Sequence, residues 1–188
     1  MIENGIQEPA YGCLYVAVGT ETQTANLLET VCPELHMYVV KRVKHKQTNG
    51  VRTYETEVLL PGYLIFTCPP GFSINRFYLF RNVRRILRYK NEEWQLQGDD
   101  LAFAKWVVRL NGEIGLSQAV REGTMIRIVS GPLKDCEGQI IKVDKHRRNC
   151  LVTLGFDNQI LKTWLAFDWL EPKEHGVQPQ STSNEEME

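Results

Sequence analysis

The sequence predicts an α+β protein, in which an antiparallel sheet flanked by helices is followed by a small SH3-like β-barrel. Two observations support this fold class. Residues 12–112 mix strand-like and helix-like segments around a strong hairpin signal. From Val120 onward the pattern changes to short strand-like runs that are separated by turn residues, with no helical segment between them.

The first two elements are a strand and a helix. Residues 14–18 alternate and are rich in strand-forming side chains. After Gly19, residues 22–32 have the spacing of a short helix, with four apolar side chains predicted to face inward: Ala25, Leu27, Leu28 and Val31.

A β-hairpin is predicted next. Residues 36–46 and 51–60 are both strand-like, and Asn49-Gly50 between them favours a tight type I′ turn. Residues 64–67 form a further apolar strand, which the proline and glycine residues at 69–71 end.

Two more helices and two short strands complete this half of the chain. Ser73 can cap a helix running towards Asn82, and Asp99 places negative charge at the start of a helix that stops at Asn111-Gly112. Residues 86–89 and 94–96 are predicted as short strands between the two helices.

The remaining chain divides into a brief linker, a β-rich unit and a tail. The predicted strands are residues 125–129, 137–143, 150–154 and 159–163, with a short remnant near Phe167. The acidic tail has no apolar periodicity and is expected to be disordered. The predicted units are therefore residues 12–112, a linker at 113–119, the barrel at 120–171 and the tail at 172–188.

Charge is distributed unevenly along the chain. The net charge is −1, but residues 41–90 hold eleven Lys or Arg and only two acids, which gives 11 − 2 = +9. A solvated surface usually mixes both signs, so this segment favours contact with nucleic acid. A solvated charged face remains the alternative.

No specific signal for catalysis, metal binding or a cofactor is present. The five cysteines are widely spaced and form no Cys-x-x-Cys pair, and the four histidines are scattered singly. We expect reduced, mostly buried cysteines, no metal, no cofactor and no enzymatic activity. The first residues lack a secretory pattern and no apolar run could span a membrane, so a cytoplasmic protein without membrane contact is expected.

Residues 121–144 resemble the KOW motif. Gly123, the Gly131-Pro132 turn and Gly138 are spaced as in that motif, where glycines permit the sharp reversals of a small barrel and the alternating Ile and Val fill its interior. Because KOW motifs also occur in ribosomal proteins, the motif alone indicates a binding module.

The N-terminal half points to one family. The segment Leu60-Pro61-Gly62-Tyr63 is similar to the Phe-Pro-Gly-Tyr strand start of the NusG N-terminal (NGN) domain, and Leu14-Tyr15-Val16 is similar to its opening Trp-Tyr-Val. With the hairpin and Arg81-Asn82, the resemblance to NusG transcription elongation factors covers about residues 13–171. It is closest to specialised paralogs such as LoaP.

The resemblance implies that the protein binds RNA polymerase. In the family, an apolar depression of the NGN domain binds the clamp helices of the polymerase, and the matching residues here are Leu14, Tyr15, Leu60 and Tyr63. Burial in the protein's own core is the alternative, above all for the two leucines. Processive antitermination by a monomer recruited through a nascent RNA hairpin is the expected function, with housekeeping pausing or termination and ribosome-associated RNA binding as alternatives.

Two further surfaces are predicted. The nucleic-acid surface, for RNA or for non-template DNA, comprises Arg42, Lys44, Lys46, Arg76, Arg81, Arg84, Arg85 and Arg88. A surface for a ribosomal protein or a termination factor comprises Lys134, Lys145, His146, Arg147, Arg148, Phe156 and Ile160. A solvated loop is an equal alternative for residues 145–148.

Overall fold

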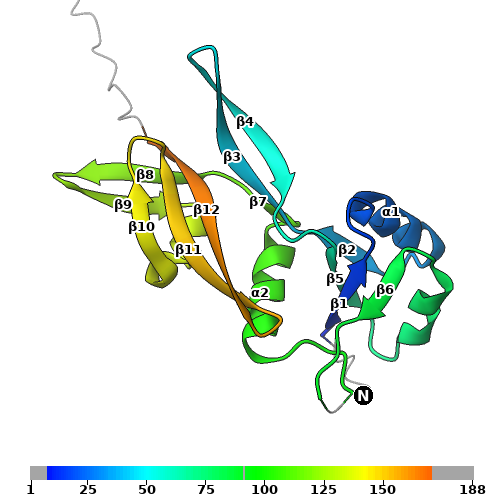
Figure 1. Ribbon diagram of the computed structural model, residues 1–188. Helices are drawn as coiled ribbons and strands as arrows, with labels where there is room; N and C mark the ends of the chain where they lie inside the picture. The colour runs from blue at the N-terminus through cyan, green and yellow to red at the C-terminus, as the bar shows by residue number, and fades with distance from the viewer. Residues whose placement is uncertain (1–7, 91, 171–188) are drawn as a thin grey trace, which may run out of the picture.

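The computed structural model describes residues 8–90 and 92–170, and the tail predicted at 172–188 lies outside this range. The protein is α+β, with far more strand than helix (Figure 1). Three sheets and two long helices, α1 (Glu21–Val31) and α2 (Gly98–Arg109), make up most of the described chain.

A four-stranded antiparallel sheet is the centre of the N-terminal half. It contains β1 (Ala10–Val16), β2 (His36–Val39), β5 (Tyr63–Cys68) and β6 (Val83–Ile86), in the order β2-β5-β1-β6. Side chains alternate across this sheet. Leu14 and Leu64 join the cluster that contains Leu28 of α1, whereas Cys13 and Ile65 join the cluster that contains Phe103 of α2.

The predicted hairpin is confirmed at Asn49-Gly50, but its first strand, expected at 36–46, is divided into β2 and a separate strand that belongs to another sheet. Strands β3 (Lys41–Thr48) and β4 (Val51–Val58) pair along their whole length, and β7 (Glu113–Ile114) adds a short parallel strand to β3. Asn49 and Gly50 both have positive φ, at 51° and 78°, as a type I′ turn requires. The hairpin projects from the first sheet and lies beside the C-terminal sheet (Figure 1).

The C-terminal half is a five-stranded sheet. It contains β8 (Ser117–Glu122), β9 (Met125–Ser130), β10 (Ile140–Asp144), β11 (Asn149–Phe156) and β12 (Gln159–Trp169), in the order β10-β11-β12-β8-β9. The short helices α3 (Pro132–Asp135) and η2 (Glu137–Gln139) connect β9 to β10. Gly131 before α3 has φ of 87°, and a Cβ there would lie 2.7 Å from the Ser117 backbone, so only glycine fits.

Several element boundaries differ from the prediction. The strand expected at 137–143 begins only at Ile140 because η2 precedes it, and the separate runs at 159–163 and 167 form one strand, β12. The strand expected at 86–89 lies at 83–86, residues 94–96 are irregular, and the helix expected from Ser73 is the 3₁₀ helix η1 (Ile74–Leu79).

The inward face of α1 was predicted only in part. Ala25 and Leu28 are buried, but Leu27 and Val31 are about half exposed, at 47% and 51%. Thr24 is fully buried in their place and bonds to Thr20. The helix is therefore rotated relative to the prediction, with a polar threonine on its buried face.

The two halves share one core. Phe103 and Trp106 of α2 pack in the same cluster as Leu154 and Phe156 of β11, and the Phe103 and Phe156 ring centroids are 4.9 Å apart. The linker predicted at 113–119 includes β7 and the first half of β8, with residues 115–116 between them outside any strand. The two predicted units thus pack against each other along a seam, which contains the contacts of α2 with β11 and of β3 with β12.

Candidate functional site

The four residues matched to the polymerase contact have different environments. Leu14 is fully buried with Val16 and Leu28, so it belongs to the core and to no surface. Tyr15 and Tyr63 are partly exposed and meet edge to face, with ring centroids 5.3 Å apart. The structure therefore removes Leu14 from the predicted contact and leaves an aromatic pair.

Tyr63 is partly covered by the C-terminal half. Its ring lies 5.8 Å from that of Phe156, and its hydroxyl donates a hydrogen bond of 3.0 Å to the Asp157 carboxylate. A small cavity of about 100 Å³ joins Leu60 and Tyr63 to Phe156 and Ile160. Residues predicted to bind two different partners thus face each other across the seam.

Asp157 lies at the tip of the β11–β12 hairpin and links the two halves. Asp157 and Asn158 have φ of 53° and 56°, which a two-residue I′ turn requires. The Asp157 backbone N–H donates a hydrogen bond of 2.8 Å to the Asp100 carboxylate, and the Asp157 carboxylate lies 3.7 Å from the Arg85 guanidinium. Burial and the bond to Asp157 raise the pKa of the Tyr63 phenol, so its neutral form is favoured at the seam.

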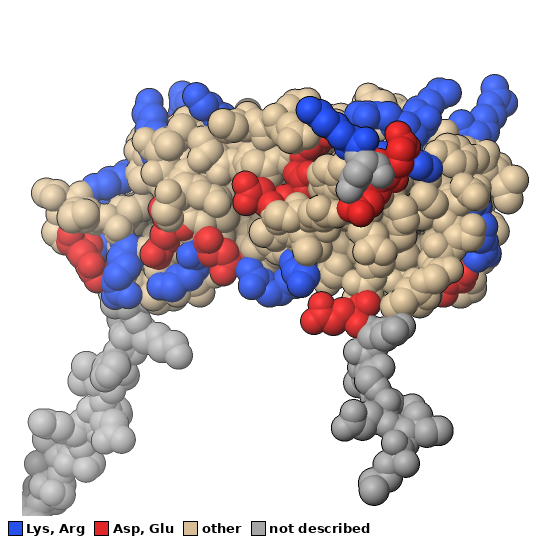
Figure 2. Space-filling model, turned by 90° about the horizontal axis from the view of Figure 1, so that it is seen from below, with Lys and Arg blue, Asp and Glu red and all other residues tan. Residues whose placement is uncertain are grey.

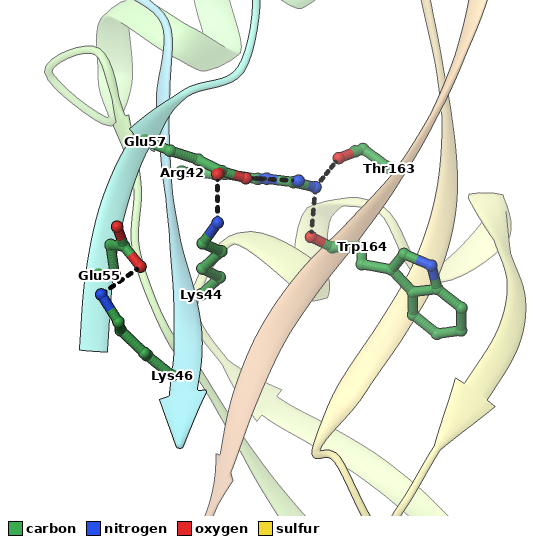
Figure 3. A network of polar contacts seen from close by, with 7 residues as sticks. All are labelled: Arg42, Lys44, Lys46, Glu55, Glu57, Thr163 and Trp164. Carbon is green, nitrogen blue, oxygen red and sulfur yellow. Dashed lines mark hydrogen bonds and ion pairs between the residues drawn. The ribbon is translucent and has the colours of Figure 1, made fainter. Parts of the chain in front are cut away.

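The three cations predicted on β3 are engaged with acids (Figure 3). Arg42 and Lys44 both bind Glu57, and Lys46 pairs with Glu55 at 3.4 Å. Hydrogen bonds from Lys44 and then from Arg42 hold the pKa of the Glu57 carboxyl below its ordinary value. Cross-strand pairing therefore holds these three cations beside acids, although the two acids are already counted in the net charge of +9 for residues 41–90.

Arg42 also connects the hairpin to the C-terminal sheet. Its guanidinium donates to the Thr163 hydroxyl and, at 2.9 Å, to the Trp164 carbonyl of β12 (Figure 3). Its side chain is only 22% exposed. Arg42 is thus a structural link across the seam, and it is not available for nucleic acid while the halves are docked.

The remaining predicted cations divide into paired and free groups. Arg76 pairs with Glu34, Arg88 with Glu92 at 3.2 Å, and Arg85 lies between Asp157 and the Tyr15 ring. In the described part of the chain, the exposed side chains of Arg81 and Arg84 show no ion pair or hydrogen bond. These two are the cations most available to a ligand.

The loop that carries Arg81 is anchored by Asn82. The Asn82 carbonyl accepts from the Ala17 N–H at 2.9 Å, and its amide donates to Thr24 at 3.3 Å. Arg81 and Arg84 are therefore held on a fixed backbone beside β1. Acidic side chains lie next to many of the Lys and Arg groups in the view of Figure 2, so the charge is more mixed in space than along the sequence.

The cations predicted on the C-terminal half are mostly tethered. Lys134 lies 3.8 Å from Glu137, Lys145 donates to the Thr124 carbonyl, Arg147 lies 4.0 Å from Asp144, and Arg148 pairs with Asp168 at 2.9 Å. The two apolar members differ. Phe156 is buried in the seam, whereas Ile160 is 75% exposed and remains accessible.

Asp168 is the centre of a second polar link across the seam. The Tyr54 hydroxyl of the hairpin donates a hydrogen bond of 2.5 Å to one carboxylate oxygen of Asp168, and Arg148 donates to the other. The His45 Nε2 lies 3.8 Å from that second oxygen. Burial alone would raise the pKa of Asp168, but the bonds from Tyr54 and Arg148 outweigh it and lower that pKa.

Sequence reasoning did not single out Asp157, Asp168 or His45. Asp157-Asn158 is a hairpin-turn pair, and that signal could have predicted a tip. Nothing local distinguishes Asp168 or His45, because their roles depend on partners more than 100 residues away in sequence.

The described residues contain no group of three His, Cys, Asp or Glu side chains arranged to hold a metal. All five cysteines are buried and unpaired, and burial raises the pKa of Cys68, Cys136 and Cys150 to about 11. Thiols held in this form are poor nucleophiles. Among the described helices, none has the length and apolar character needed to cross a membrane.

No family model matches the sequence, and no curated protein is significantly similar to it. Function must therefore be argued from the residues themselves.

Proposed function

We propose that this chain is a NusG-type transcription elongation factor that binds RNA polymerase and promotes processive antitermination. In this proposal residues 12–112 are an NGN domain, residues 120–171 are a KOW domain, and the protein is a cytoplasmic monomer without enzymatic activity. The observation that carries the proposal is the aromatic pair of Tyr15 and Tyr63, with the Arg85 guanidinium 5.5 Å from the centre of the Tyr15 ring. Aromatic and arginine side chains together are typical of protein-binding hot spots.

Polymerase binding through Tyr63 requires the seam to open. The Phe156 ring and the Asp157 carboxylate contact Tyr63, and in this proposal they compete with the clamp helices for it. A protein that is mostly docked binds with an apparent affinity reduced by the fraction that is open. Polymerase access is thus set by the contacts that Asp157 makes with Tyr63 and Arg85.

The nucleic-acid contact proposed here centres on Arg81 and Arg84, with Arg85 joining them when Asp157 withdraws. Arginine can bind phosphate with two parallel hydrogen bonds or stack on an unpaired base. A nascent RNA hairpin offers both kinds of group, and non-template DNA is the alternative ligand. Arg76 and Arg88 are engaged with nearby acids and contribute less.

Transcription in vitro through an intrinsic terminator, with and without this protein and its native leader RNA, tests the proposal. We expect more read-through when the protein and the leader are both present. Increased termination or pausing would instead identify a housekeeping type of factor. No effect on elongation or termination, with folded protein and active polymerase, would refute the proposal.

One observation favours a second candidate, a KOW-containing ribosome-associated RNA-binding protein. Arg81 and Arg84 are exposed while Tyr63 is covered, so RNA can be bound without opening the seam. Purification of the tagged protein from its cells separates the candidates. Recovery with polymerase subunits supports the first, and recovery with ribosomal particles supports the second.

A further inference from the structure

A second cationic site lies between the hairpin and the C-terminal sheet, away from β6 (Figure 1). The loop of residues 145–148 lies opposite β3 and β4, and the Arg52 guanidinium donates to the His146 carbonyl at 3.4 Å. A cavity of about 380 Å³ opens there. Its lining residues, three from each half, are His45, Lys46, Arg52, His146, Arg147 and Asn149.

This lining is suited to an anion. It contains three permanent cations, two histidines and one asparagine, and no acid. The acids nearby are already engaged: Glu55 with Lys46, Asp144 with Arg147, and Asp168 with Tyr54 and Arg148. These pairs reduce the positive potential without filling the cavity. Arg147 is 79% exposed and can turn to a ligand at small cost.

His45 supplies an unused polar atom. Its side chain is only 7% exposed, and its Nε2 lies 3.0 Å from the Phe167 carbonyl, so Nε2 is the donor there. The other ring nitrogen, Nδ1, is buried and has no hydrogen-bond partner among the described residues. Buried polar atoms without partners are uncommon in folded proteins. With Nε2 as the donor, Nδ1 is an acceptor, and it can accept a hydrogen bond from a sugar hydroxyl or a base N–H of a ligand in the cavity that His45 lines.

We propose that this cavity binds a phosphodiester group of single-stranded nucleic acid. Arg52, Arg147 and Lys46 supply donors to the phosphate oxygens, and His146 and Asn149 can bond to the adjoining sugar or base. The site contains neither Arg81 nor Arg84.

The composite origin of the site has a thermodynamic consequence. A ligand that contacts both halves binds only while they are docked, so it shifts the protein towards the docked form. Nucleic acid in the cavity therefore keeps Tyr63 covered and opposes polymerase binding. This coupling must be reciprocal.

The test uses the full chain with Arg81→Gln and Arg84→Gln already in place, so that the nucleic-acid contact proposed at these two arginines does not contribute to binding. Fluorescein-labelled ten-nucleotide oligo-U and oligo-dT are titrated by fluorescence anisotropy at two salt concentrations. Arg52→Gln and Arg147→Gln are compared with Lys162→Gln, which removes an exposed cation that does not line the cavity. The logarithm of the association constant K falls linearly with the logarithm of the salt concentration. Each cavity variant should make this slope shallower by about 0.7, which corresponds to roughly fivefold weaker binding near 0.1 M salt.

The control should bind both probes as the parent does. Stronger binding of oligo-U than of oligo-dT would assign the site to RNA, and the reverse to single-stranded DNA, and either result supports a phosphodiester site. The probe should also raise the thermal unfolding midpoint of the parent more than that of Arg52→Gln. If Arg52→Gln and Arg147→Gln retain parental affinity and salt slope, or if Lys162→Gln weakens binding equally, the proposed site is wrong.

Discussion

Replacement of Arg42 by glutamine should destabilise the protein, because this side chain joins the hairpin to β12. Its guanidinium makes two contacts to Glu57 and donates to Thr163 and to the Trp164 carbonyl. A hydrogen bond that involves a charged group contributes about 1.5–3 kcal/mol. Lys44 still pairs with Glu57 in the variant, so the acid is not left alone. The Trp164 carbonyl and Thr163, however, lose their donor.

We therefore expect Arg42→Gln to lower the free energy of unfolding by about 2–3 kcal/mol, less than the sum of its bonds because neighbouring contacts are not additive. Urea unfolding followed by tryptophan fluorescence measures this. Lys46→Gln is the matched control, since Lys46 is 54% exposed and makes one ion pair at 3.4 Å. It should stay within about 0.5 kcal/mol of wild type. Equal stability of the two variants would refute the structural role assigned to Arg42.

Three further predictions concern the seam and the exposed arginines. Asp157→Asn preserves the turn but removes the charge that binds Tyr63. Docking of the two halves should therefore weaken by about 1 kcal/mol, and the affinity for isolated clamp helices should rise about fivefold. Unchanged affinity would show that Asp157 does not control polymerase access. The lowered pKa of Asp168 gives stability that is present above its ordinary pKa of about 4 and is lost as the pH falls through the lower folded value. Urea midpoints between pH 7 and pH 2 should therefore fall less in Asp168→Asn than in wild type, and parallel curves would contradict this. Arg84→Ala should bind a native leader hairpin and a scrambled one more equally than wild type does, in fluorescence titrations with Lys162→Ala as the control; wild-type discrimination would remove Arg84 from RNA reading.

The candidate surfaces show where sequence reasoning succeeds and where it fails. The exposure of Arg84 agrees with the surface role predicted from its charge, because no group in the described part of the chain pairs with it, although β6 begins three residues before the strand predicted at 86–89. The availability of Arg42 does not follow, since its partners Thr163 and Trp164 lie over 120 residues away. Charge counted along a segment therefore overestimates the charge that a ligand encounters.

Local rules determined the α+β class, the Asn49-Gly50 hairpin and α2, because turn geometry, side-chain alternation and helix capping act over a few residues. The burial of Leu14 and the exposure of Leu27 were decided by tertiary packing, since either side of a short amphipathic element can face the core. Packing also decided that Tyr63 faces Phe156 and that Glu57 contacts two cations. The docking of the two halves depends on contacts between residues far apart in sequence, and no local pattern specifies which of them will meet.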